Sequence, residues 1–279
     1  MPGPSPVLIT GCSSGIGRAT ARRLAEKGHT VYATARRLEG LDDLESAGCR
    51  LLTLDVTDEA SMTAAVERVT ADCGAVGSLV NNAGYSQSGA VEAVPMEQIR
   101  RQFETNVFGL VRLTQLVLPG MRERRAGRIV NVSSMGGRLV FPGGGFYHAT
   151  KYAVEALTDA LRFEVGGFGI QAVLIEPGLI RTRFGETAAG GVDAPEDAAY
   201  AFFHAAVAEV TRKAYEGPMS KLGAGPEAVA AAIERALTSR RPRPRYVVTA
   251  SARILLTQRR LMTDRAWDRA MRLQFPRPN

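Results

Sequence analysis

Short apolar runs alternate with helical patterns along most of this chain of 279 residues, and this alternation strongly constrains the fold. Short buried strands that alternate with helices form βαβ units, whose strands are parallel and whose crossovers are right-handed. We therefore predict one doubly wound parallel α/β sheet of about seven strands, at Val7–Thr10, Thr30–Ala35, Arg50–Leu54, Ser78–Asn81, Arg128–Val132, Gln171–Ile175 and Arg245–Thr249. The main helices are expected at Arg18–Lys27, Glu59–Asp72, Met96–Met121, Tyr147–Phe168 and Pro226–Thr238.

The regular alternation loosens after Pro177-Gly178. Residues 179–225 hold several glycines and prolines and one helical stretch, Asp197–Tyr215, and we interpret them as a helical lid over a site. The last thirty residues have a helical pattern in which apolar residues stand among arginines. We therefore expect one domain over residues 1–250 and a C-terminal helical extension over 251–279, packed on or beside it.

Composition is typical of a globular protein. The hydrophobic content is 45% and the charged content 23%, and no stretch approaches the roughly 20 apolar residues of a membrane span. The first residues lack the zones of a signal peptide. Cys12, Cys49 and Cys73 are scattered, which suits reduced thiols, and they show no metal-ligand spacing. These features predict a cytoplasmic protein without a metal site.

The net charge of +7 is concentrated near the C-terminus. Residues 240–279 hold eleven arginines against two aspartates, a local charge of +9, so the rest of the chain sums to −2. A basic amphipathic helix can lie on an anionic membrane, and a basic patch can bind nucleic acid. We favour a third interpretation, a helix that packs its apolar side and exposes its charges. We expect no nucleic acid partner and at most peripheral membrane contact.

A glycine-rich turn, Thr10–Gly17, joins the first strand to the first helix. Glycines there let the backbone turn tightly and approach a pyrophosphate, which then binds at the helix N-terminus. The spacing is G-x-x-x-G-x-G rather than the G-x-G-x-x-G dinucleotide fingerprint. A turn that binds no nucleotide is the alternative, but the strand before it and the helix after it favour nucleotide binding.

Tyr147 and Lys151 lie four residues apart in a predicted helix, and Ser134 precedes the tyrosine by thirteen residues. Positions i and i+4 share a helix face, so the phenol and the ammonium project together. A fixed positive charge favours phenolate and lowers the tyrosine pKa towards the range of a general acid or base. A serine hydroxyl beside them could hold a carbonyl or alcohol oxygen. Alone, such a pair can also be a solvated helix face.

Together these motifs resemble the short-chain dehydrogenase/reductase family over about residues 7–250. The family's T-G-x-x-x-G-x-G motif matches Thr10–Gly17, and its N-N-A-G motif matches Asn81–Gly84. Its P-G motif matches Pro177-Gly178 and is followed by the family's threonine at Thr182. The resemblance implies a single-domain Rossmann-type fold. It also implies a catalytic tetrad of Asn106, Ser134, Tyr147 and Lys151.

The second strand ends in Ala35-Arg36-Arg37, where the family's NAD-selecting acid would align with Ala35. That acid is missing, and a guanidinium at Arg36 suits a 2′-phosphate through charge-assisted, bidentate hydrogen bonds. A solvated strand end is the alternative for the two arginines. We predict NADP(H), held by Gly11, Ser13, Ser14, Gly15, Ile16, Gly17, Arg36, Arg37, Asp55, Val56, Asn82, Ala83, Gly84, Tyr147, Lys151, Pro177, Gly178, Ile180 and Thr182.

The resemblance also implies a mechanism. In the reducing direction NADPH delivers hydride to a carbonyl carbon while Tyr147 donates a proton to its oxygen. Lys151 would lower the tyrosine pKa and bind the nicotinamide ribose, and Ser134 would polarise the carbonyl. Asn106 would hold a water in a proton relay. Ser133 competes for the serine role, but the family's separation of thirteen residues favours Ser134.

Family substrates rest between the loop after Ser134 and the segment after Pro177-Gly178. Both segments are rich in large apolar side chains, and we predict Phe141 and Phe184 as substrate contacts beside Ser134 and Tyr147. An apolar pocket suits a lipophilic ketone or alcohol, although core packing is the alternative for most of these side chains. His148 has no role in the family and is interpreted as packing or pocket wall. The cofactor strings look most like members acting on steroids, retinoids or other hydrophobic carbonyls.

The sequence thus predicts an NADP(H)-dependent carbonyl reductase or alcohol dehydrogenase, which by resemblance forms a homodimer or homotetramer through its long helices. One alternative is a ketoreductase acting on carrier-bound or polyketide intermediates, for which the basic tail could dock an acidic carrier protein. A second alternative is a catalytically silent NADP(H) sensor. Such sensors typically lose part of the tetrad, whereas this chain keeps all four residue types.

Overall fold

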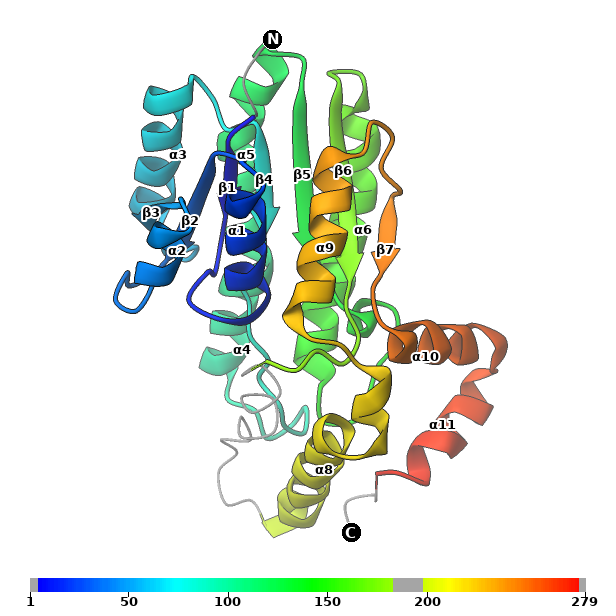
Figure 1. Ribbon diagram of the computed structural model, residues 1–279. Helices are drawn as coiled ribbons and strands as arrows, with labels where there is room; N and C mark the ends of the chain where they lie inside the picture. Colours follow the sequence, from blue (N-terminus) through cyan, green and yellow to red (C-terminus); the bar gives the residue numbers. More distant parts are fainter. Residues whose placement is uncertain (1–4, 183–197, 276–279) are drawn as a thin grey trace.

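One parallel sheet of seven strands forms the centre of the molecule (Figure 1). The computed structural model describes residues 5–182 and 198–275. The strand order is β3-β2-β1-β4-β5-β6-β7, with β1 (Val7–Ile9), β2 (Val31–Ala35), β3 (Arg50–Thr53), β4 (Ser78–Asn81), β5 (Gly127–Val132), β6 (Ile170–Glu176) and β7 (Arg245–Val247). The predicted doubly wound sheet of seven strands is confirmed, and each strand end lies within two residues of its expected position.

The strand order reverses beside β1, which pairs with β2 on one side and β4 on the other. Leu8 is in register with both Tyr32 and Leu79, so the three strands end at nearly the same level. In open parallel sheets such a switch point leaves a crevice outside the carboxyl ends of the strands, where ligands bind. The topology therefore locates the site before any side chain is considered.

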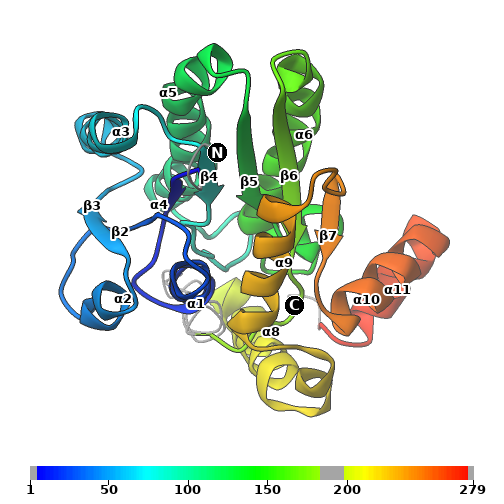
Figure 2. The ribbon, with the colours of Figure 1, turned by 45° about the horizontal axis from the view of Figure 1, so that its top comes forward.

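Helices cover both faces of the sheet (Figure 2). The α-helices of the described residues are α1 (Gly15–Glu26), α2 (Asp42–Ser46), α3 (Glu59–Cys73), α4 (Met96–Phe103), α5 (Gly109–Glu123), α6 (Gly145–Gly166), α8 (Ala198–Glu216), α9 (Pro226–Thr238), α10 (Ala250–Leu261) and α11 (Asp264–Arg272). Because side chains alternate along a strand, Val7 and Ile9 pack with α1, α2 and α9, while Leu8 packs with α3, α5 and α6. Each face thus has its own buried core.

The helix predicted over Met96–Met121 is interrupted by a π-helical turn, Glu104–Phe108, between α4 and α5. In that turn the Gly109 N–H donates to the carbonyl of Glu104, five residues earlier. A Cβ on Gly109 would lie 2.2 Å from the carbonyl oxygen of Val56, so only glycine allows this close approach of helix and loop. The widened turn carries Asn106, and such turns occur often at functional sites.

The C-terminal elements lie at the carboxyl edge of the sheet (Figure 1). Helix α8 confirms the helical stretch predicted at Asp197–Tyr215, and α10 and α11 follow β7. Residues 183–197, which include Phe184, lie outside the described residues. Across residues 5–182 and 198–275, none of the helices combines the length and apolar character needed to cross a membrane.

Candidate active site

A cavity of about 1300 Å³ runs along the carboxyl edge of the sheet. Its walls extend from Arg36, just after β2, past Ser134, just after β5, to Ile254 in α10. Most predicted site residues in the described part of the chain line this cavity. The exceptions are Gly17, Arg37 and Asn106.

The glycine-rich turn is shaped for close approach of a ligand to the backbone. Gly11 and Gly15 have φ angles of +73° and +57°, in the left-handed region that favours glycine. A Cβ on Gly17 would lie 2.3 Å from the carbonyl oxygen of Gly11, so this glycine lets α1 pack tightly against the turn. Ser14 precedes α1 without a side-chain cap, which leaves the helix N-terminus suited to an anion.

The N-N-A-G segment fastens this turn from behind. The Asn82 amide donates to the carbonyls of Thr10 and Gly11, at 2.9 and 3.2 Å. The N–H groups of Asn82 and Ala83 both donate to the Thr10 hydroxyl, at 3.0 and 2.9 Å. These four bonds fix the turn at the carboxyl ends of β1 and β4. The segment therefore shapes the nucleotide turn as well as lining the cavity.

The two arginines after β2, Arg36 and Arg37, differ in their position relative to the cavity. Both are exposed, but only Arg36 lines the cavity. Ala35 is buried at the position where a carboxylate would select NAD. Asp55 and Val56, after β3, also line this end of the cavity. The arrangement fits an adenosine with a 2′-phosphate beside Arg36, and gives Arg37 no place in that contact.

Ser134 and Tyr147 meet where the two halves of the cavity join. Ser134 follows β5 and accepts a hydrogen bond from the Gly136 N–H at 3.0 Å. Burial raises the pKa of the Tyr147 phenol, and the hydrogen bond with Ser134 opposes that rise. The Ser133 hydroxyl instead lies near Gly137, where an added Cβ would be 2.8 Å from it. The structure therefore places Ser134, and not Ser133, against the tyrosine.

Lys151 lies behind the tyrosine and is buried. Its ammonium donates to the carbonyl of Val132 at 2.9 Å and lies 5.9 Å from the centre of the Tyr147 ring. Burial lowers the pKa of Lys151 to about 8, and attraction to Glu155 opposes the shift. Burial of the phenol dominates in this geometry and raises the pKa of Tyr147, and the expected lowering contribution of Lys151 stays a prediction.

Asn106 acts as a structural tie. Its amide donates to the carbonyl of Tyr85 at 2.8 Å and to the Thr150 hydroxyl at 3.2 Å, and its oxygen accepts from the Tyr85 N–H at 3.0 Å. The side chain thus links the segment after β4 to α6. The water relay through Asn106 stays a prediction.

His148 is a positioning residue that the sequence did not reveal. Its Nε2 accepts from the Phe141 N–H at 3.1 Å, and its Nδ1 lies 2.9 Å from the carbonyl oxygen of Gly136. A neutral ring that donates from Nδ1 satisfies both contacts, and burial lowers the pKa of the ring. His148 therefore holds the loop after Ser134 in place, besides forming pocket wall as expected. One feature of the sequence could have indicated this role: His148 is a polar residue on the buried face of the predicted catalytic helix.

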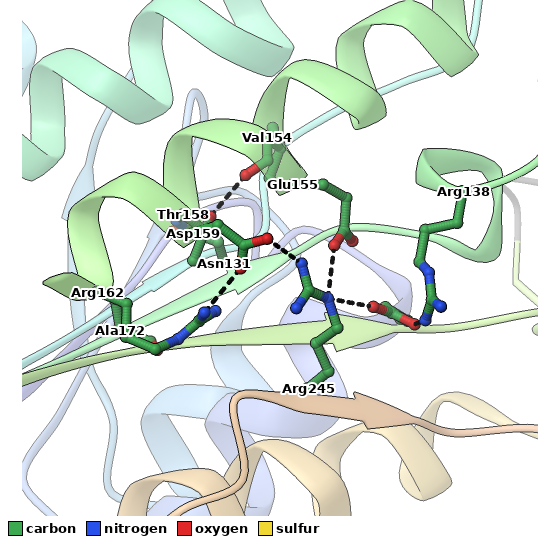
Figure 3. A network of polar contacts seen from close by, with 10 residues as sticks. Asn131, Arg138, Val154, Glu155, Thr158, Asp159, Arg162, Ala172 and Arg245 are labelled. Atoms are coloured by element: carbon green, nitrogen blue, oxygen red, sulfur yellow. Dashed lines mark hydrogen bonds and ion pairs between the residues drawn. The ribbon is translucent and has the colours of Figure 1, made fainter.

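A network of ion pairs, in part buried, joins α6, β6 and β7 (Figure 3). The Arg245 guanidinium lies 3.0 Å from carboxylate oxygens of both Glu155 and Glu176, and it also pairs with Asp159. Arg138 pairs with Glu176 at 3.0 Å. Glu176 is fully buried, and burial raises the pKa of Glu155. These residues come from four separate segments, so their meeting could not be predicted from the sequence.

The remaining predicted residues close the site from the β6 side. The Pro177 carbonyl accepts from the Met135 N–H at 2.8 Å, and Gly178 and Ile180 line the cavity beside it. Thr182 lies against the nucleotide turn, since a Cβ on Gly15 would be 3.3 Å from its methyl group. Among residues 5–182 and 198–275, no three His, Cys, Asp or Glu side chains could together hold a metal ion.

The fold and the cavity have counterparts in known proteins. Residues 5–191 match the family model described as short chain dehydrogenase. A short-chain dehydrogenase structure from Streptomyces avermitilis aligns with a TM-score of 0.80 and 39% identity, covering 97% of this chain and 95% of that one. The closed form of a serine dehydrogenase with NADP+ aligns with a TM-score of 0.76 and 30% identity, covering 88% and 94%.

Two relatives of named activity are also similar in sequence. A 3-ketodihydrosphingosine reductase of Bacteroides thetaiotaomicron is 43% identical over 182 residues, which are 65% of this chain and 66% of the relative. An NADPH-dependent 3-dehydrocapnine reductase of Ornithobacterium rhinotracheale is 34% identical over 271 residues, 94% of each chain.

Proposed function

This chain belongs to the short-chain dehydrogenase family, and on that basis we propose that it interconverts a lipophilic ketone or aldehyde and its alcohol, with Tyr147 as general acid and base. It is an oxidoreductase that acts on CH–OH groups and uses NADP(H). The observation that carries the proposal is the hydrogen-bonded pair of Ser134 and Tyr147, placed between the nucleotide turn and the apolar end of one cavity.

The residues present fit the cofactor. The turn at Gly11–Gly17 and the N-terminus of α1 would hold the pyrophosphate, and Arg36 would hold the adenosine 2′-phosphate. Asp55 and Val56 would contact the adenine, and Lys151 the nicotinamide ribose. When bound, NADP(H) supplies or accepts the hydride.

The chain's own side chains handle the proton. Tyr147 donates it to the carbonyl oxygen in reduction and takes it back in oxidation, and Ser134 orients that oxygen. Lys151 keeps a positive charge near the phenol and favours its ionised form as the proton leaves. Asn106 fixes the segment after β4 against α6, and we expect it to hold a water in the proton relay.

Two observations support a lipophilic substrate. The cavity wall beyond Tyr147 is made mostly of apolar side chains from α8, α10 and α11. One relative is named for reduction of a ketodihydrosphingosine, and another for reduction of a 3-dehydrocapnine. Because all four residue types of the tetrad are present, we expect turnover. The alternative, a catalytically silent NADP(H) sensor, is distinguished by the assay described below.

We also place the enzyme in the cytoplasm as a homo-oligomer. Cys12, Cys49 and Cys73 are free thiols, which supports a reducing compartment. Large apolar side chains stand exposed on and beside the long helices α5 and α6, including Phe108 and Phe163, which supports pairing of two copies through these helices.

The proposal is tested by NADPH consumption with a panel of ketones. Replacing Tyr147 with Phe removes only the hydroxyl, so kcat should fall at least about hundredfold, because general acid–base catalysis contributes roughly 10²–10⁴-fold. Thermal stabilisation by NADPH should persist. The matched control is Tyr152→Phe, an exposed tyrosine on the same helix, which should keep wild-type kcat.

Near-normal turnover by Tyr147→Phe would refute the acid–base assignment. Stabilisation by NADPH without turnover of any ketone by the wild type would refute the enzyme proposal and favour a sensor.

A further inference from the structure

The C-terminal extension forms part of the cavity wall. Five residues of α11 and the segment just after it line the cavity, namely Trp267, Ala270, Met271, Gln274 and Phe275. Their spacing is i, i+3, i+4, i+7 and i+8, which is one continuous face of a helix. Arg265, Asp268 and Arg269 stand exposed on the rest of the helix. The extension therefore contributes an apolar stripe to the site.

Helix α8 presents a second stripe to the same cavity. Its lining residues are Val207, Val210, Thr211, Ala214 and Tyr215, again at i, i+3, i+4, i+7 and i+8. Eight residues of helix rise by about 12 Å, so each stripe extends over roughly that length. We call the space between the two stripes the α8–α11 slot.

The α8–α11 slot begins at the catalytic tyrosine. Tyr215, at one end of the α8 stripe, is close enough to Tyr147 to raise the pKa of its phenol electrostatically. The Phe141 ring lies 5.9 Å from the ring of His148 and 6.3 Å from that of Trp267, between centroids. Phe141 thus bridges the catalytic helix and α11. The slot leads away from Tyr147 on the side opposite the nucleotide turn.

The walls of the slot are mostly apolar, and their polar groups come from Thr211, Tyr215, Gln258 and Gln274. Among the described residues that line it from α8, the turn after it, α10 and α11, none carries a formal charge. Val207, Trp267 and Met271 belong to one hydrophobic cluster, so side chains of both helices contribute to the same buried core beside the slot. An uncharged, mostly apolar slot of this length suits an extended hydrocarbon chain.

We propose, resting on the function proposed above, that the α8–α11 slot binds the aliphatic chain of the substrate. The substrate class is then a ketone or alcohol carrying a linear hydrocarbon chain. Its oxygen lies at Ser134 and Tyr147, and its chain lies between α8 and α11. The extension is a substrate-binding element, and the arginines on its outer side take no part in this contact.

The test measures kcat/KM for butanone, octanone and hexadecanone with NADPH. Burying one methylene contributes about 0.8 kcal/mol, so kcat/KM should rise up to about fourfold per added methylene until the slot is full. Ala270→Trp fills the slot from α11, and Thr211→Phe fills it from α8. In both variants the preference for the longer ketones over butanone should be lost.

The matched control is Arg269→Trp, which adds an indole to the exposed side of the same helix and should keep the wild-type preference. Thermal stabilisation by NADPH checks that each variant is folded. Fluorescence of a long-chain polyene fatty acid, added to Tyr147→Phe, measures chain binding without turnover. Ala270→Trp in that background should weaken the binding at least tenfold.

Three results would overturn the proposal. Wild-type enzyme could reduce all three ketones equally, or prefer a steroid ketone to hexadecanone. Ala270→Trp could keep the wild-type chain-length preference while folded. In each of these cases ketone reduction persists, so the proposed function stands and the slot assignment falls. Loss of reduction for every ketone in the wild type would instead refute the proposed function itself, and the chain-binding role with it.

Discussion

At the scale of single residues, burial moves the pKa values of the catalytic pair. Burial raises the pKa of Tyr147 and lowers that of Lys151 to about 8. At neutral pH the phenol therefore carries its proton and the ammonium its charge. These are the forms that donation of a proton to a carbonyl requires.

The pKa of Lys151 predicts the pH dependence of reduction. Below pH 8 the lysine is charged, and above pH 8 it becomes neutral, so kcat/KM should be level below about pH 8 and fall above it. Glu155 raises the pKa of Lys151 by electrostatic attraction. Replacing Glu155 with Gln removes that attraction, and the falling limb should move to lower pH.

The measurement is the pH profile of kcat/KM for NADPH-dependent reduction. Glu164→Gln, an exposed site on the same helix, is the matched control and should keep the wild-type profile. The Arg245 guanidinium keeps two acidic partners in Glu155→Gln, namely Glu176 and Asp159. If the falling limb of Glu155→Gln stays at the wild-type pH, Glu155 does not tune Lys151.

Arg36 is the second residue with a defined test. A hydrogen bond to a charged group contributes about 1.5–3 kcal/mol, so Arg36→Ala should raise the KM for NADPH roughly tenfold to hundredfold. The KM for NADH should change little, because NADH has no 2′-phosphate. Arg37→Ala should leave the ratio of the two unchanged, since Arg37 does not line the cavity. If the ratio of the KM values for NADPH and NADH is unchanged in Arg36→Ala, Arg36 does not contact the 2′-phosphate.

At the scale of elements, periodicity and local contacts determine different things. The strands and most helices follow from apolar patterns and lie close to their expected ranges. The π-helical turn at Glu104–Phe108 does not, because one extra residue in a turn leaves the apolar pattern of a long helix nearly unchanged. Only the tertiary structure shows what the turn does, because there Asn106 hydrogen-bonds to both Tyr85 and Thr150.

Helix α11 shows the same division. Its apolar residues are evident in the sequence, but periodicity does not say what the apolar face will cover. Trp267 and Met271 are buried in one cluster with residues of α8, whereas Leu273, just after α11, is 86% exposed. A tail that looked like a packed or membrane-bound helix therefore contributes a wall of the cavity.

At the scale of the whole molecule, the carboxyl edge of the sheet brings cofactor-binding and substrate-binding segments into one cavity. The cavity runs from the end of β3 to the end of β6, five strand spacings of about 4.8 Å, or roughly 24 Å. Its first half fits a dinucleotide and its second half is apolar. Tyr147 lies between the two halves because α6 starts beside the carboxyl end of β5.

The outer faces of α5 and α6 give the last prediction. Phe163 on α6 is 87% exposed, and burying a phenylalanine contributes about 1.5–3 kcal/mol. In a two-fold dimer the residue counts twice, so Phe163→Glu should convert the dimer or tetramer to smaller species in sedimentation velocity. Leu261→Glu, a similarly exposed site on α10, should leave the assembly unchanged. A wild-type monomer would contradict the predicted pairing.

The sequence by itself determined the parallel sheet, the nucleotide turn and the spacing of Ser134, Tyr147 and Lys151. These features are local, since they depend on periodicity and on residues close together in the chain. Tertiary structure alone decided the separation of Arg36 from Arg37, the His148 contacts, the Glu155–Arg245 network and the slot between α8 and α11. Each of these depends on contacts between distant segments, and the apolar pattern of a segment does not specify which partner will cover it.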